Sequence, residues 1–279
     1  MTNKILIPVD GSANSDIAVE YGIYIARKLN STLSALHVMD VNLLQGPMLT
    51  DISGAAVMPP SESFLDAVEA SLNEKADLIL KSFREHCRWK GLQVETKKVV
   101  GRISETISEE ARDADLIVMA KKGEHFHLKA GGFLGSVAES VIRHAAKPVM
   151  VTPENFLEIE SMAIAYDGSL SAQKALDFSL NLSKQAVWPI TAVIITEDMG
   201  KASKLTMQIE NAAEKEETEC EVIILPGKEG TEILKFIGEG AVELMVMGAY
   251  GHNRLRELLL GSTTSQVIQK SPVPVLLMR

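Results

Sequence analysis

Cysteine is scarce in this chain of 279 residues, and its scarcity excludes two classes of protein. Cys87 and Cys220 are the two cysteines of the sequence, one in each half, and neither belongs to a C-x-x-C pair. Disulfide frameworks and cysteine-based metal centres need thiols that recur in pairs or at short spacing. We therefore expect two reduced thiols, and neither a disulfide bridge nor a metal site.

Excess positive charge and long hydrophobic runs are also lacking. With 28 Lys and Arg against 37 Asp and Glu, the net charge is −9, so the chain has no basic field to attract nucleic acid. No apolar run approaches the roughly 20 residues of a bilayer span, and the N-terminus leads into a short strand rather than a signal peptide. We expect a soluble, cytoplasmic protein whose partners are neither nucleic acid nor a membrane.

The common motifs of phosphoryl and nucleotidyl transfer are missing as well. The sequence has no G-x4-G-K-[ST] loop, no H-x-G-H signature and no S-G-G-x-D loop. No Ser-His-Asp arrangement or paired-carboxylate motif stands out either. We therefore assign no catalytic residue and no metal ligand.

What the sequence does contain is an internal duplication. The segments 4–12 and 162–169 each carry a hydrophobic strand that runs into Asp-Gly-Ser. Later pairs match too: Leu116-Ile-Val-Met119 answers Leu244-Met-Val-Met247, and Pro148-Val-Met-Val answers Pro274-Val-Leu-Leu. A repeat of this length indicates two homologous domains, which we place at residues 1–153 and 160–279. The polar, turn-prone segment between them is the expected join.

Short apolar runs alternate with longer segments of helical period in each half, which is typical of βαβ units. We predict an α/β fold of two homologous domains, each a five-stranded parallel sheet with helices on both faces. The predicted strands are 4–9, 33–39, 93–100, 115–120 and 148–152, then 161–166, 190–196, 221–225, 243–248 and 274–278. The clearest predicted helices are 12–29 and 169–184.

The two halves differ most between residues 41 and 88. Apolar residues recur at helical spacing from Phe64 to Phe83, so a long amphipathic helix follows an insertion at 41–63. The second half needs only residues 201–219 for the corresponding connection. We interpret the insertion either as a mobile loop or as a lid or partner surface.

A glycine pattern near the C-terminus points to the chemistry. Gly248-Ala-Tyr-Gly251 follows a predicted strand, and nine residues later comes Gly261-Ser262-Thr263. Glycines after a strand let the backbone approach a ligand closely, and a helix that starts at Gly261 presents free N–H groups to an anion. The spacing therefore predicts a phosphate-binding site. The alternative is a tight strand-to-helix turn in which Ser262 and Thr263 cap the helix.

Two halves, each with a strand that leads into Asp and a later glycine run, resemble the universal stress protein family in its tandem, two-domain form. The resemblance covers essentially the whole chain. It implies the strand order 3-2-1-4-5 in each domain, so that the first and fourth strands lie side by side where the winding reverses, which is the expected ligand crevice. It also implies that the last strands, which follow Pro148 and Pro274, pair inside one chain. Whether the chain forms a homodimer as well stays open.

The resemblance further implies that ATP, with or without Mg, is the ligand of the second half. It assigns the base and the ribose to Ala165, Asp167, Ile195 and Met247. It assigns the ribose and the phosphates to Gly248, Gly251, Gly261, Ser262 and Thr263. For Asp167 the alternative is a turn or capping role ahead of the following helix.

The first half departs from this pattern. Its corresponding residues are Asp10, Val38, Met119, Gly123, Gly135, Ser136 and Val137. Ala120 replaces the first glycine, so a methyl group hinders close approach, and eleven residues rather than nine precede Gly135. We expect an empty or altered site there, with a weaker nucleotide site as the alternative. Lys121 and Lys122 are interpreted either as a pair that attracts an anion or as solvated charges.

Three functional hypotheses remain. The first is a nucleotide-binding module that regulates in response to stress or energy state. The second is a weak ATPase, and the third is an interaction scaffold that needs no nucleotide. The intact glycine pattern of the second half favours the first hypothesis over the third. The missing catalytic groups favour it over the second, so we expect slow ATP hydrolysis at most.

Overall fold

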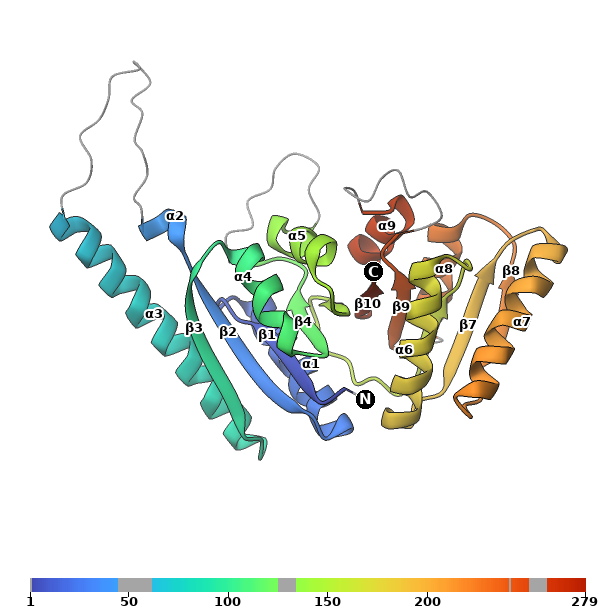
Figure 1. The fold of residues 1–279 in the computed structure, drawn as a ribbon, viewed down its shortest axis with the longest axis horizontal. Coiled ribbons are helices and arrows are strands. Elements are labelled where there is room, and N and C mark those ends of the chain that lie inside the picture. Colours follow the sequence, from blue (N-terminus) through green and yellow to red (C-terminus); the bar gives the residue numbers. More distant parts are fainter. Residues whose placement is uncertain (1, 45–61, 125–133, 241, 251–259) are drawn as a thin grey trace, which may run out of the picture.

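The two repeats form one continuous sheet (Figure 1). A computed structural model describes residues 2–44, 62–124, 134–240, 242–250 and 260–279. The ten strands of this part of the chain are ordered β3-β2-β1-β4-β5-β10-β9-β6-β7-β8. Neighbouring strands run parallel except β5 and β10, which pair antiparallel at the centre. Each half therefore has the order 3-2-1-4-5, as expected.

The elements of the first half lie close to their predicted positions. The strands are β1 (Lys4–Pro8), β2 (Thr32–Asp40), β3 (Val94–Gly101), β4 (Leu116–Ala120) and β5 (Val149–Thr152). The helices are α1 (Ala13–Leu29), α2 (Val41–Leu44), α3 (Glu62–Trp89), α4 (Ile103–Glu110), the 3-10 helix η1 (Ala111–Asp113) and α5 (Ser136–His144). Of the predicted insertion 41–63, residues 41–44 form α2 and residues 45–61 lie outside the described residues.

The second half repeats this plan. Its strands are β6 (Met162–Ala165), β7 (Ile190–Ile195), β8 (Glu221–Leu225), β9 (Leu244–Gly248) and β10 (Val275–Met278). Its helices are α6 (Leu170–Ala186), α7 (Met199–Lys215), α8 (Glu229–Gly238) and α9 (Ser262–Lys270). All ten predicted strands are confirmed. The inner strands are mostly buried apolar runs between turn residues, whereas the edge strands β3 and β8 contain no fully buried residue.

The halves share their cores. Met150 of β5 lies opposite Leu276 of β10, and both are fully buried. One apolar cluster joins the sheet to α1, α3, α6 and α7, and a second joins the other face to α4, α5, α8 and α9. Each cluster contains residues of both halves, so the two repeats are packed as one body.

The segment between the halves is held by aromatic residues of α1. Tyr21 and Tyr24 pack edge to face against Phe156, with ring centroids 4.8 and 5.8 Å apart. The Tyr21 hydroxyl accepts from Leu157 N (3.0 Å) and donates to Asn155 O (3.3 Å). The Tyr24 hydroxyl donates to Ile159 O (2.6 Å). Burial raises the pKa of both phenols. The predicted polar join is therefore fixed against the core.

The repeated Asp-Gly-Ser starts the first helix of each half in the same way. Gly11 and Gly168 have φ of +81° and +80°, a left-handed backbone that favours glycine. The following serines, Ser12 and Ser169, are the N-caps of α1 and α6, and each side chain accepts an N–H bond from three residues on. This local chemistry explains why the pattern recurs.

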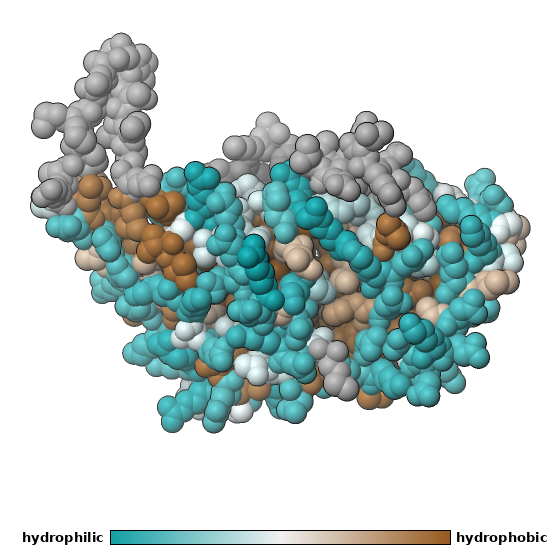
Figure 2. All heavy atoms as spheres, in the orientation of Figure 1, coloured by the Kyte–Doolittle hydropathy of each residue, from teal (hydrophilic) through white to brown (hydrophobic). Residues whose placement is uncertain are grey.

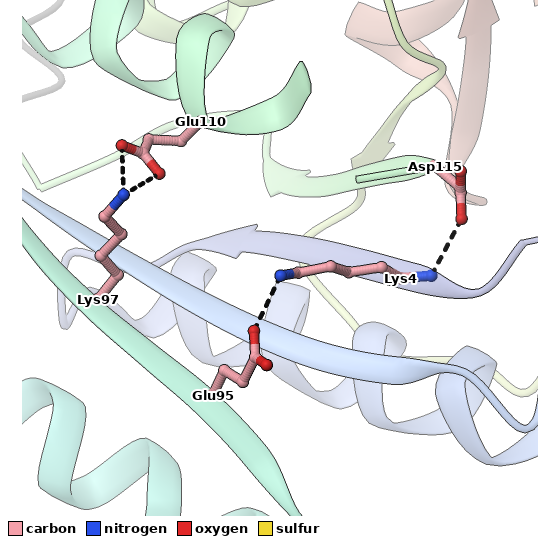
Figure 3. Close-up of polar contacts among 5 residues, drawn as sticks. All are labelled: Lys4, Glu95, Lys97, Glu110 and Asp115. Atoms are coloured by element: carbon pink, nitrogen blue, oxygen red, sulfur yellow. Dashed lines mark hydrogen bonds and ion pairs between the residues drawn. The ribbon is translucent and has the colours of Figure 1, made fainter. Parts of the chain in front are cut away.

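Polar contacts of Lys4 and Lys97 with acidic residues link elements of the first half (Figure 3). Asp115 Oδ2 accepts from Lys4 N (3.1 Å), and Lys4 Nζ pairs with Glu95 Oε2 of β3 (2.8 Å). Lys97 of β3 bonds both carboxylate oxygens of Glu110 on α4, at 2.7 and 2.6 Å. The contact with Asp115 fixes the starts of β1 and β4 beside each other, whereas the ion pairs join β1 to β3 and β3 to α4. No helix of the described ranges combines the length and the apolar composition that crossing a bilayer requires.

Candidate functional site

The winding of the sheet reverses once in each half, and a cavity lies at each reversal. In the second half β6 has β7 on one side and β9 on the other, with Ala165 opposite Met247. The first half repeats this arrangement with β1, β2 and β4. The cavity volumes are about 470 Å³ in the second half and about 530 Å³ in the first. Both fall in the roughly 300–1,000 Å³ range of small-molecule sites.

The second-half pocket brings together most of the residues that the sequence assigns to it. Its wall contains Ala165, Asp167, Ile195, Met247, Gly248, Gly261, Ser262 and Thr263. The ninth predicted residue, Gly251, lies outside the described residues. Residues more than 90 positions apart in the sequence therefore share one cavity, because β6 and β9 are neighbours in the sheet.

The N-terminus of α9 faces this cavity. Gly261 is its N-cap and has no side chain to accept hydrogen bonds from the first-turn amides. Two contacts fix the helix start to the end of β9, because Thr264 Oγ1 donates to Gly248 O (3.2 Å) and Gly261 N donates to Ala249 O (3.4 Å). The positive end of the α9 dipole is thus held at one end of the cavity, where it attracts anions.

Asp167 has the turn role that the sequence offered as an alternative, and its position leaves the ligand role as a prediction. Its Oδ1 accepts from Ser169 N at 2.8 Å, which is the predicted turn ahead of α6. The same residue lines the cavity, two positions beyond the end of β6. The turn therefore orients the carboxylate at the carboxyl edge of the sheet.

Gly248 has a structural role that the sequence interpretation missed. A Cβ at this position would lie 2.5 Å from Ser171 Oγ and 3.0 Å from Ala172 N, both in the first turn of α6. The glycine therefore lets α6 pack against the end of β9. The sequence interpretation gave close approach of a ligand as the reason for glycine here, and these contacts give a second reason within the fold. The corresponding Ala120 packs its methyl against the core cluster that contains α1.

Several residues of the wall were not predicted. They are Tyr166, Ser169, Ala172, Glu229, Ile233, Tyr250, Leu260 and Thr264. Thr264 continues the predicted Gly-Ser-Thr run and could have been included. Glu229 and Ile233 are the first and fifth residues of α8, which no motif marks. Glu229 Oε2 accepts from Thr263 Oγ1 at 3.1 Å. Tyr250 lies under the guanidinium of Arg279, 6.0 Å from the ring centroid.

The first-half pocket also collects its predicted residues. They are Asp10, Val38, Met119, Gly123, Gly135, Ser136 and Val137. Asp10 Oδ1 accepts from Ser12 N (2.9 Å), as Asp167 Oδ1 accepts from Ser169 N, and Asp10 Oδ2 accepts from Glu124 N (2.7 Å). Ile103 is the first residue of α4, and the first residue of the corresponding helix α8 is Glu229. The two pockets therefore share a plan and differ in polarity.

Lys121 is neither a solvated charge nor a free anion-binding group. Its Nζ donates to the carbonyls of Ile268 (3.3 Å) and Gln269 (3.0 Å) at the C-terminal end of α9. Burial lowers the pKa of this ammonium group. Lys122 Nζ lies 3.4 Å from Glu154. The first half thus contacts the helix whose other end lines the second-half pocket.

The two cysteines are free thiols. Burial raises the pKa of Cys87 to about 12 and that of Cys220 to about 11, so both are protonated at neutral pH. Among the residues that the structure describes, no three His, Cys, Asp or Glu side chains are grouped so as to hold a metal ion.

The chain is similar to known proteins along its whole length. The model of the universal stress protein family matches residues 1–153 and 158–279. Universal stress protein Slr1230 of Synechocystis sp. is 32% identical over 286 residues, 99% of each chain. Universal stress protein YxiE of Bacillus subtilis is 31% identical over 153 residues, 54% of this chain and 99% of its own. The crystal structure of a universal stress protein from Archaeoglobus fulgidus has the same fold, with a TM-score of 0.77, 24% identity, and coverage of 99% of this chain and 96% of that one.

Proposed function

Because this chain belongs to the universal stress protein family, we propose that its second half binds an adenine nucleotide, ATP above all, in the pocket between β6 and β9. The observation that supports this most directly is the meeting of Asp167 and the N-terminus of α9 in one cavity. We propose binding rather than turnover, so that nucleotide occupancy reports the energy or stress state of the cell to a partner.

The two ends of the pocket differ in the way that a nucleotide requires. Ala165, Ile195 and Met247 supply an apolar end at the strand termini, suited to a purine. At the other end, Gly261, Ser262 and Thr263 supply main-chain amides and hydroxyls suited to phosphates. Asp167 would bond the ribose or the base edge, since its carboxylate is an acceptor. The ligand would therefore lie across the carboxyl ends of the strands.

The charge of the wall bears on the cation that accompanies the nucleotide. The described lining residues include two carboxylates, Asp167 and Glu229, and neither Lys nor Arg. Glu229 lies at the phosphate end, where it bonds Thr263. A carboxylate beside a polyphosphate is repulsive unless a cation lies between them. We therefore propose that Mg binds together with the nucleotide and that Glu229 would hold it. The Mg ion would neutralise the negative charge of the phosphates.

Gly261→Val tests the phosphate assignment. A Cβ at this position would make ordinary contacts, 3.4 Å to Thr264 Oγ1 and 3.5 Å to Ala249 O, and φ is −56°, so the fold tolerates a side chain. The two valine methyls would cover the first-turn amides. We expect ATP affinity by calorimetry to fall at least about a hundredfold, with an unchanged circular dichroism spectrum.

Gly261→Ala is the matched control, because its single methyl leaves the amides open and should retain most of the affinity. Mass spectrometry of the purified, gently denatured protein should release about one adenine nucleotide per chain. Undiminished ATP affinity in Gly261→Val would show that the phosphates bind elsewhere.

A further inference from the structure

The first-half pocket has a wall that the second half does not reproduce. α2 contributes Leu43, and α3 contributes Leu72 and Lys75. No described residue of α7, which takes the place of α3 in the second half, lines the other pocket. The segment in which the two halves differ most therefore forms one side of this cavity.

Most of the surface inside this cavity is apolar. The apolar side chains that line it include Leu36 and Val38 of β2, Met119 of β4, Ile103 and Ile107 of α4, and Leu134. Ile103 is decisive, because the equivalent position of the other pocket carries the carboxylate of Glu229. At this position an apolar side chain replaces the carboxylate, while both pockets keep a helix start at a glycine N-cap, Gly135 in the first half and Gly261 in the second.

The acidic groups of this wall already have partners within the chain. Both oxygens of Asp10 accept backbone N–H bonds, as described above. Asp40 Oδ1 accepts from Asn42 N at 2.9 Å. Glu139 lies 3.7 Å from the guanidinium of Arg143 on the same helix. These carboxylates are therefore compensated before any ligand enters.

The basic groups are compensated too. Lys75 Nζ lies 2.5 Å from Glu124 Oε1, and this ion pair joins α3 to the end of β4. Lys121 donates to the last carbonyls of α9. The imidazole Nδ1 of His37 is 2.7 Å from Val9 O. A ligand whose charge needed one of these side chains would have to displace a contact within the chain, whereas an uncharged ligand would leave all of them intact.

Apolar surface continues from the cavity to the outside. Leu43, in the wall, is 44% exposed, and Phe64 near the start of α3 is 52% exposed. Figure 2 shows hydrophobic residues gathered over α2 and the beginning of α3. An apolar molecule would therefore meet a favourable surface at this side of the cavity.

We propose that the first-half pocket binds an uncharged, largely apolar small molecule rather than a nucleotide. Its cavity of about 530 Å³ is large enough for a compound of two or three fused or linked rings. The tandem chain would then hold two different ligands, a nucleotide in one half and an apolar compound in the other. This inference stands on the first-half wall alone and does not depend on nucleotide binding in the second half.

Two fluorescent probes with the same aromatic body test the proposal on the full chain. N-phenyl-1-naphthylamine is neutral, and 1-anilinonaphthalene-8-sulfonate carries one added sulfonate. We expect saturable binding of one neutral probe per chain, and at least tenfold weaker binding of the sulfonate. Equal or tighter binding of the sulfonate would overturn the proposal, as would the absence of saturable binding of the neutral probe.

Variants locate the probe. Ile103→Glu copies into this pocket the residue that the second half carries, at a helix start where a carboxylate is favourable. This substitution should weaken binding of the neutral probe at least tenfold without lowering the melting temperature of the protein. Leu72→Gln, on the opposite wall, should weaken it several-fold, whereas Leu78→Glu should not, because that exposed side chain of α3 lies outside the wall.

Unchanged binding in both wall variants would place the probe elsewhere and refute the assignment. Saturating ATP should leave the neutral probe bound. Displacement by ATP would mean that the first-half pocket is a nucleotide site, which also contradicts the proposal. A chain that binds no ATP at all but binds the probe would support this inference and refute only the proposed function.

Discussion

Glu229 places a carboxylate beside the amides at the start of α9, where it bonds Thr263 Oγ1 at 3.1 Å. Glu229→Gln keeps an acceptor for Thr263 and removes the charge. In EDTA we expect the variant to bind ATP roughly threefold to tenfold more tightly than the wild type, because one repulsion is gone. With Mg present, the difference should vanish or reverse. Calorimetric titrations with and without Mg measure both values.

Glu232→Gln is the matched control. It removes a charge from the same first turn of α8, but Glu232 lies outside the pocket wall. Its ATP affinity should follow the wild type under both conditions. If Mg increased the affinity of the wild type and of Glu229→Gln by the same factor, Glu229 would have no part in holding the cation.

At the scale of elements, α9 connects the two halves. Its first turn lines the second-half pocket, and its last carbonyls accept hydrogen bonds from Lys121 of the first half. A cation at this end complements the helix dipole and satisfies terminal carbonyls. Lys121→Met keeps the length of the side chain and removes its donors. We expect a loss of about 1–2 kcal/mol in the free energy of unfolding, measured by urea titration.

ATP affinity in Lys121→Met should also fall, by about twofold to threefold, because the start of α9 is then less firmly positioned. Lys122→Met is the control, since it removes a neighbouring ammonium group that pairs with the exposed Glu154 rather than with α9. The free energy of unfolding of this control should fall by less than about 0.5 kcal/mol. Equal stability of the two variants would show that the contacts of Lys121 with α9 are unimportant.

At the scale of the whole molecule, the pairing of β5 with β10 closes both repeats into one sheet. A fragment of residues 158–279 would expose the edge of β10, whose Val275, Leu276 and Leu277 are buried in the full chain. An apolar edge strand with free N–H and C=O groups pairs readily with another strand. We expect this fragment to dimerise through β10, with a dissociation constant in the micromolar range or below.

Light scattering after size exclusion would measure the mass of the fragment, and the full chain is the reference. Leu276→Lys in the fragment should prevent dimerisation, because two such ammonium groups would meet at the pairing edge. A fragment that is monomeric and cooperatively folded without this substitution would show that the shared cores of the two halves are dispensable.

The sequence by itself determined the ten strands, the starts of α1 and α6 at Asp-Gly-Ser, and the helix start at Gly261. These features depend on residues a few positions apart, through apolar periodicity, turn conformation and capping hydrogen bonds. The family resemblance added the strand order and, with it, the position of both pockets at the winding reversals.

Only the tertiary structure decided which residues complete those pockets and how the halves are joined. Glu229 meets Thr263 across 34 positions, and Lys121 meets Gln269 across 148. Gly248 proved to accommodate α6, which approaches it from a segment almost 80 residues earlier. Such contacts have no local signature, because they arise when strand pairing brings distant helix ends together. The two pockets differ in polarity within a common plan because equivalent wall positions carry different residues, such as Ile103 in one and Glu229 in the other.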